Sequence, residues 1–273
     1  MQASCMVSAA LWAVLMVAGV GVAHAERLTL VEDGRASASI VLAAQPTRAA
    51  QFAAAELQYH LARMTGATMP VVTDADGTLG TAILVGESAA TRALGLASEG
   101  FKPQEYLVGV RPGALVLIGR DKDDRGVLDY QNARTFPDDF DEQGTVYAVY
   151  DFLERFCDVR WYLPTELGEV IPSRRTLTVA GRDIRRRPAM VYRYVFMSEA
   201  LPADLIGDTI GHEGGYPSLD LRPARLYVRR MRQGGSAYDA NHSFEGYPAR
   251  FAEEHPDWFA QDQNKGEPPQ LCY

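Results

Sequence analysis

The sequence is poor in cysteine and lysine, and beyond its first 25 residues it has no long apolar run. It holds three cysteines and three lysines among 273 residues, and Cys-x-x-Cys and His-x-x-x-His pairs are absent, so a zinc site built on such pairs has no ligands. Phosphate-loop, Gly-x-Gly-x-x-Gly and Gly-x-Ser-x-Gly motifs are also missing, which removes the usual nucleotide, dinucleotide and α/β-hydrolase chemistries. The net charge of −8 excludes a nucleic-acid binder that depends on bulk positive charge.

The first 25 residues differ from the rest of the chain. Residues 11–22 are apolar and uncharged, too few to span a bilayer comfortably, and Ala23-His24-Ala25 places small residues where a signal peptidase cuts. We predict a signal peptide over residues 1–25 and a secreted or periplasmic mature chain, with no membrane contact after cleavage. The alternative is an uncleaved anchor, because residues 1–10 carry no Lys or Arg.

From residue 26 the pattern is that of alternating strands and helices. Apolar residues recur at three- and four-residue spacing over 46–64 and again over 144–156, which predicts two amphipathic helices. The pattern predicts one α/β domain over 26–185 and an exposed linker over 183–188. Expected strands cover 27–31, 39–42, 69–73, 82–85, 106–110, 115–118, 159–163, 169–171 and 176–179.

Past Pro188 the character changes. A strand over 190–196, a helix over 222–232, a second strand over 241–244 and a helix over 248–255 look like the first β/α units of a barrel. Residues 189–273 are too few to close such a barrel, so we expect a truncated barrel-like domain. Cys157 is expected to be a small buried hydrophobe, and its pairing with Cys272 is left open.

Two groups of segments carry a resemblance to known proteins. Residues 144–154 and 159–172, preceded in order by 53–57, Gly66, 83–86 and 117–121, resemble the N-terminal domain of family 67 α-glucuronidases. They are more similar still to an uncharacterised family of secreted bacterial proteins that joins this domain to a barrel-like one. The early part of that second domain is resembled by residues 241–244, 247–248, 251, 254–259 and 270–272.

The resemblance implies a two-layer α/β sandwich, similar to the non-catalytic second domain of β-hexosaminidases, followed by the incomplete start of a (β/α) barrel. In family 67 the acid and base carboxylates belong to later parts of the barrel, so this chain is expected to lack them, and whether it is an enzyme stays open. The expected function is that of an exported glycoside hydrolase-like protein of polysaccharide metabolism with a carbohydrate partner. The alternative is a non-catalytic carbohydrate-binding or adhesion module.

Four residues are candidates for substrate contact. Glu213 lies in a glycine-rich loop, and Asn241 and His242 lie side by side at the predicted second barrel strand, where they can hydrogen-bond to sugar hydroxyls. Trp258 offers a ring on which a sugar can stack. The competing interpretations are a solvated loop for Glu213 and simple helix packing for Trp258.

The polar stretch 121–143 is rich in aspartate. Short spacing between oxygen ligands suits Ca²⁺, but a glycine-centred twelve-residue calcium loop with a closing Glu is absent. We therefore expect neither a metal nor a cofactor. The acidic residues concerned are Asp121, Asp123, Asp124, Asp138, Asp139 and Asp141.

Overall fold

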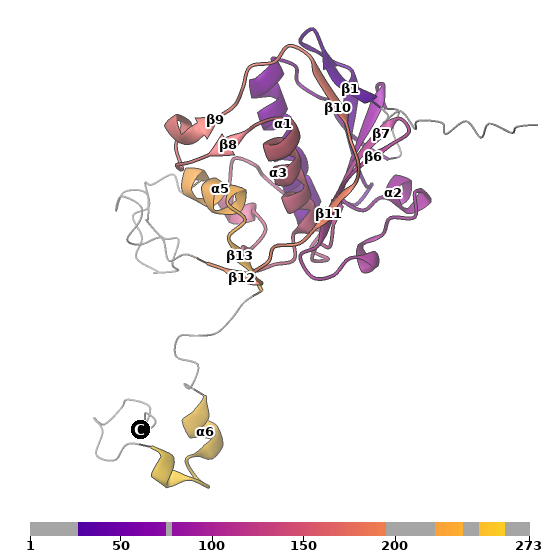
Figure 1. Ribbon diagram of the computed structural model, residues 1–273. Helices are drawn as coiled ribbons and strands as arrows, with labels where there is room; N and C mark the ends of the chain where they lie inside the picture. Colours follow the sequence, from indigo (N-terminus) through magenta and orange to yellow (C-terminus); the bar gives the residue numbers. More distant parts are fainter. Residues whose placement is uncertain (1–26, 75–77, 195–221, 237–245, 260–273) are drawn as a thin grey trace, which may run out of the picture.

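The computed structural model describes residues 27–74, 78–194, 222–236 and 246–259, which form a mixed α/β structure with several sheets (Figure 1). The largest sheet has six strands in the order β11-β6-β7-β5-β3-β4. Strands β4, β3, β5 and β7 run parallel, and β6 is antiparallel to both of its neighbours. The strands are β3 (Ala38–Leu42), β4 (Val71–Thr73), β5 (Thr81–Val85), β6 (Tyr106–Arg111), β7 (Ala114–Gly119) and β11 (Ile184–Arg186).

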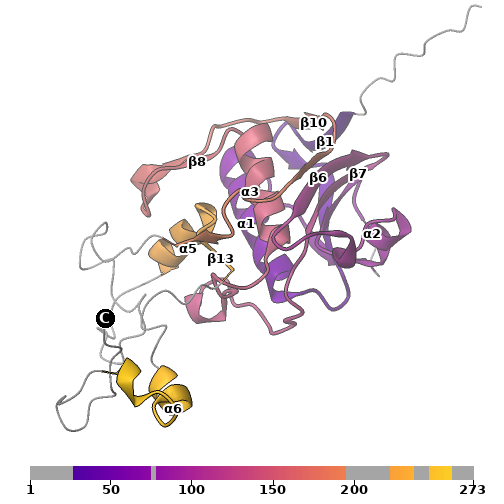
Figure 2. The same cartoon turned by 60° about the horizontal axis from the view of Figure 1, so that its bottom comes forward.

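Helices cover both faces of this sheet. The long helices α1 (Arg48–Thr65) and α3 (Gly144–Phe156) lie side by side on one face, and the short α2 (Ala89–Ala93) lies on the other (Figures 1 and 2). The buried residues form two clusters, a large one beneath α1 and α3 and a smaller one on the α2 side. The sheet is therefore enclosed by helices, as its run of buried parallel strands requires.

Smaller elements complete the described structure. Three further sheets join β10 (Leu177–Ala180), β1 (Arg27–Glu32) and β2 (Arg35–Ala36); β8 (Arg160–Trp161) and β9 (Glu169–Val170); and β12 (Tyr192–Arg193) and β13 (Gly234–Gly235). The remaining helices are α5 (Arg222–Arg230), α6 (Tyr247–Phe251) and the 3-10 turns η1 (Ser98–Gly100), η2 (Ala133–Thr135), η3 (Glu166–Gly168) and η5 (Pro256–Trp258). Within the described ranges, the model contains no helix that is both long and apolar enough to cross a membrane.

Helix α1 shows how the sequence sets these elements. Thr47 caps its start by accepting a hydrogen bond from the backbone N–H of Ala50 at 3.1 Å. Gly66 ends it at φ 78°, a left-handed conformation that a glycine adopts without strain. Phe52 and Leu57 lie on the inner face and are completely buried. The predicted helix over 46–64 is thus confirmed, as are the helix over 144–156 and the burial of Cys157 at its end.

The expected linker over 183–188 is wrong at residues 184–186. Ile184–Arg186 forms β11, which pairs antiparallel with β6 at the edge of the main sheet. Arg185 binds the carboxylate of Glu105 at 2.9 Å and lies over the ring of Phe101. A charged side chain is well suited to an edge strand, because it discourages pairing with another chain.

Helix α5 packs against the α/β unit. Leu226 belongs to the large core cluster, and the side chains of Arg229 and Arg230 are 2% and 5% exposed. Pairing between β12 and β13 fastens the same segment a second time. The barrel start and the division into domains at residues 185 and 189 stay predictions.

Candidate functional site: a pocket at the carboxyl edge of the sheet

The order of the strands reverses between β3 and β5. From β3 the chain passes through α1 to β4 on one side, whereas from β5 it passes through α2 and β6 to β7 on the other side. The two connections lie on opposite faces of the sheet (Figure 1). In open α/β sheets such a reversal leaves a crevice beyond the carboxyl ends of the strands, and ligands bind there.

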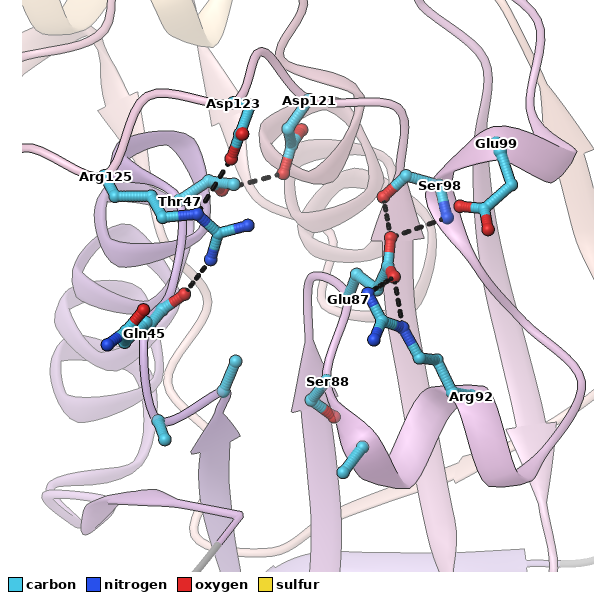
Figure 3. Close-up of a pocket in the computed structure, with 13 residues that line it drawn as sticks. Gln45, Thr47, Glu87, Ser88, Arg92, Ser98, Glu99, Asp121, Asp123 and Arg125 are labelled. Atoms are coloured by element: carbon cyan, nitrogen blue, oxygen red, sulfur yellow. Dashed lines mark hydrogen bonds and ion pairs between the residues drawn. The ribbon is translucent and has the colours of Figure 1, made fainter.

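A pocket of about 470 Å³ occupies this position (Figure 3). Its walls come from the segments that directly follow β3, β5 and β7, and from the turn η1. The side chains in the lining include four carboxyl groups and two guanidinium groups. The residues are Ala43, Ala44, Gln45, Thr47, Glu87, Ser88, Ala89, Arg92, Ser98, Glu99, Asp121, Asp123 and Arg125.

Asp121 joins the starts of the two long helices. Its Oδ1 accepts a hydrogen bond from the backbone N–H of Thr145 in the first turn of α3, at 2.9 Å. Its Oδ2 accepts from Oγ1 of Thr47, the cap of α1, at 3.2 Å. Burial raises the pKa of the Asp121 carboxyl to about 6, although these hydrogen bonds oppose the shift. The carboxylate thus occupies the place between two helix starts where an anionic ligand would otherwise be favoured.

Glu87 forms the opposite wall together with Ser98 and Arg92. Its carboxylate accepts hydrogen bonds from the backbone N–H of Ser98 at 2.8 Å and from the Ser98 hydroxyl, and it pairs with Arg92. Burial disfavours the charge, but these hydrogen bonds outweigh that effect and hold the pKa of Glu87 below its usual range. Glu87 therefore stays an anion that ties η1 and α2 to the end of β5.

Arg125 reaches into the pocket from the loop after β7. Its guanidinium donates to Oδ1 of Asp123 at 2.8 Å and to the backbone carbonyl of Gln45. In Figure 3 it lies across the opening from the Glu87–Arg92 pair. The pocket therefore presents hydrogen-bond donors and acceptors on both sides.

A second cavity of about 290 Å³ lies where α1, the β8–β9 hairpin and α5 meet. Below it is a buried network centred on Glu56, which is completely buried on α1. Arg230 binds Glu56 at 2.8 Å and also pairs with Glu169. The hydroxyls of Tyr130 and Tyr150 donate to the same Glu56 carboxylate. Burial is the largest single influence and opposes ionisation, but the Arg230 and His60 charges and the hydrogen bonds from Arg230 and Tyr130 together outweigh it and lower the pKa of Glu56 to about 2.

His60 extends this network toward the hairpin. Its Nδ1 lies 2.7 Å from the carbonyl of Glu56, and its Nε2 lies 3.1 Å from Nε1 of Trp161. Because the indole can only donate, Nε2 accepts and Nδ1 carries the proton. Burial lowers the pKa of His60, which keeps the ring neutral. The polar groups of this network hydrogen-bond to one another, so their role is to hold the packed elements together.

The sequence-predicted site residues are not brought together in the described part of the chain. Glu213, Asn241 and His242 lie outside the described residues. Trp258 lies in η5. Its ring is stacked on that of His255, with 3.9 Å between the ring centroids, and is tilted against that of Phe251, with 5.8 Å between the centroids. Neither pocket described above is lined by Trp258.

Sequence reasoning missed the pocket at the strand reversal. The signal available was that a polar residue lies shortly after each of three predicted strands, at Gln45, Glu87 and Asp121. What was not available was the order of the strands, since neighbours in the sheet are not neighbours in the chain.

The chain matches no protein-family model and no curated protein. Among solved structures it is similar to a family GH115 4-O-methyl-α-glucuronidase with specificity for decorated arabinogalactans, at 16% identity and a TM-score of 0.44 over 76% of this chain and 25% of that one. It is also similar to the β-hexosaminidase of Streptomyces plicatus, at 15% identity and a TM-score of 0.37, and to the GH20 β-N-acetylhexosaminidase of Streptomyces coelicolor A3(2), at 14% and 0.36. Each of these two matches covers 62% of this chain and 25% of the other. The chain thus spans about a quarter of the length of these glycoside hydrolases, and with TM-scores below 0.5 they lend no weight to a functional assignment.

Proposed function

We propose that the chain is the N-terminal part of an exported glycoside hydrolase-like protein of polysaccharide metabolism, and that its α/β unit is non-catalytic. The observation that carries this proposal is where the segments of the resemblance lie in the fold. Residues 53–57 lie in α1 and Gly66 is its C-cap, while residues 83–86 and 117–121 include the last residues of β5 and β7 and continue past them. The segments that carry the resemblance, taken in chain order, therefore lie in the main sheet and in a helix that covers it.

The non-catalytic role is supported by the state of the carboxyl groups. Glycoside hydrolysis needs two carboxyl groups that flank the scissile bond and are free to exchange protons or attack. Glu56, Glu87, Asp121 and Glu169 instead accept hydrogen bonds from their own chain. They hold helices and loops in place.

Helix α5 supports a role as the base of a following domain. The chain leaves the main sheet after β11, and its described continuation at residues 222–236 is fastened back onto α1 by the Arg230–Glu56 pair. A unit that positions the start of a barrel needs such an anchor. In this proposal residues 1–25 are a signal peptide, 26–185 the α/β unit and 189–273 the start of the barrel, in which Glu213, Asn241, His242 and Trp258 contact substrate.

Hydrolysis assays test the proposal. The purified chain and any longer product of the same gene are incubated with aldouronic acids and aryl glycosides. We expect hydrolysis by a longer product that includes a closed barrel and none by the 273-residue chain. Turnover by the 273-residue chain would overturn the non-catalytic assignment.

The second candidate is a carbohydrate-binding or adhesion module without any catalytic partner. The pocket at the strand reversal favours it, because this pocket is built by the α/β unit alone. Retention of the chain on immobilised xylan and other polysaccharides, with no hydrolysis by any product of the gene, would favour the module over the hydrolase.

A further inference from the structure

We propose that the pocket at the strand reversal, between the ends of β3, β5 and β7, is a binding site for a small, neutral, hydroxyl-rich ligand of the mono- or disaccharide class. The proposal concerns the α/β unit itself and holds whether or not a catalytic barrel follows. It assigns a ligand to a part of the molecule that the hydrolase proposal treats only as a support.

Position and size are the first argument. The pocket lies at the topological switch point, where sheets of this kind bind ligands. Its volume of about 470 Å³ falls within the range of small-molecule sites. The walls are rigid, because Glu87 fixes η1 and α2 while Asp121 fixes the starts of α1 and α3.

The lining chemistry is the second argument. Donors from Arg92 and Arg125 stand beside acceptors from Glu87, Glu99 and Asp123. A hydroxyl group both donates and accepts, so a polyol can satisfy the two kinds of group at once. Each guanidinium already has a carboxylate partner, Glu87 for Arg92 and Asp123 for Arg125, so neither needs an anion from outside.

Other ligand classes fit the pocket poorly. An anion would be repelled, because the lining has four carboxyl groups and only two guanidinium groups. The carboxyl group of Asp121 also fills the position between the helix starts. Aromatic and large aliphatic side chains are absent from the lining, so an apolar ligand gains little. The described part of the chain also holds no cluster of three His, Cys, Asp or Glu side chains suited to a metal ion.

Calorimetric titration of the full chain tests the assignment. The probes are xylobiose, cellobiose and galactobiose, with glucuronic acid and glucose 6-phosphate as charged counterparts. We expect saturable binding of at least one neutral disaccharide, and at least tenfold weaker binding of the charged probes. Backbone amide NMR shifts should change in segments 43–47, 87–99 and 121–125. No binding by the neutral probes, or tighter binding by the charged ones, overturns the assignment.

A blocking variant and a matched control locate the site. Ala89 lines the pocket and is exposed, and its side chain is a single methyl group, so Ala89→Trp fills the space without removing a side-chain hydrogen bond. We expect at least a tenfold loss of affinity. Ala180→Trp adds the same bulk to an exposed alanine at the end of β10 and should leave affinity unchanged. If Ala89→Trp fails to fold, Ala44→Trp blocks the other wall.

The outcomes separate this inference from the hydrolase proposal. Equal affinity of the wild-type chain and a folded blocking variant would refute the pocket assignment and would not affect the hydrolase proposal. Turnover by the 273-residue chain would refute the non-catalytic assignment. Ligand binding in the pocket is tested by the titrations alone.

Discussion

Nε of Arg230 lies 2.8 Å from Oε2 of Glu56, although the two residues are 174 positions apart in the chain. Both side chains are buried, at 5% and 0% exposure. An unpaired charge would be costly in such a place, and each side chain offsets part of the cost of burying the other. The pair therefore holds α5 against α1, so that segment 222–236 packs as part of the α/β unit.

Removal of the cation should be severe. Arg230→Met leaves Glu56 buried without its partner, and we expect a loss of about 3–5 kcal/mol in the free energy of unfolding. Urea denaturation followed by tryptophan fluorescence measures it. Arg92→Met is the control, because Arg92 is 67% exposed in its own ion pair and should cost less than about 1 kcal/mol. Equal losses in the two variants would contradict a special role for Arg230.

The double variant gives a sharper result. Glu56→Gln combined with Arg230→Met removes both charges, so it should cost less than the sum of the two single variants, with a coupling of about 1–3 kcal/mol. Additive losses would show that the two side chains do not act on each other.

Asp121 should give a pH dependence of a definite sign. Its pKa is raised from 3.8 to about 6 in the folded chain, so its contribution to stability is present below about pH 4 and is lost as the pH rises through 6. Asp121→Asn removes that loss. We therefore expect the stability of the variant, relative to wild type, to increase from pH 4 to pH 7 in urea titrations. A relative stability that falls over this range would contradict the assignment.

His60 should act in the opposite direction. Burial lowers its folded pKa below 6.5, so its contribution is present above pH 6.5 and is lost as the pH falls through the folded pKa. Wild-type stability should decline in acid more steeply than that of His60→Gln. The matched control is His255→Gln, since His255 lies in the separate segment 246–259. Parallel pH profiles for wild type and His60→Gln would rule out this role.

Gly119 marks a close approach between β7 and α3. A Cβ placed there would lie 2.4 Å from the backbone carbon of Gly144 and 2.8 Å from the carbonyl of Glu105. Gly119→Ala should therefore lower the free energy of unfolding by about 1–3 kcal/mol or more, because backbone has to move. Gly100→Ala is the control, since nothing lies within 4 Å of the added carbon. Similar stabilities of the two variants would contradict the close packing.

Local patterns predicted the long elements of the fold. Helix α1 has a threonine cap, an alanine-rich buried face and a terminal glycine, and all three act within the helix itself. The sequence did not reveal β11, because only Ile184 is apolar and two arginines follow it. An edge strand of this kind is set by its partner β6 and by the Arg185–Glu105 pair, which are 80 residues away.

The candidate pocket was harder to predict for the same physical reason. Each wall is a short polar segment after a strand, and only the strand order brings the three together. Glu56 was a usable signal, since a glutamate on the inner face of an apolar helix demands a buried partner. The identity of that partner, Arg230, depends on tertiary packing and could not be read locally.

The most direct test of the non-catalytic assignment is the rate of sugar release by the purified 273-residue chain from aldouronic acids and aryl glycosides between pH 4 and 8. Wild type, Glu87→Gln and Asp121→Asn are assayed at equal protein concentration and compared with a buffer blank. We expect all three proteins to match the blank, because these carboxyl groups hold loops and helix starts and take no part in bond cleavage. Release above the blank by wild type would contradict the non-catalytic assignment, and its loss in a folded Glu87→Gln or Asp121→Asn variant would identify the carboxyl group responsible.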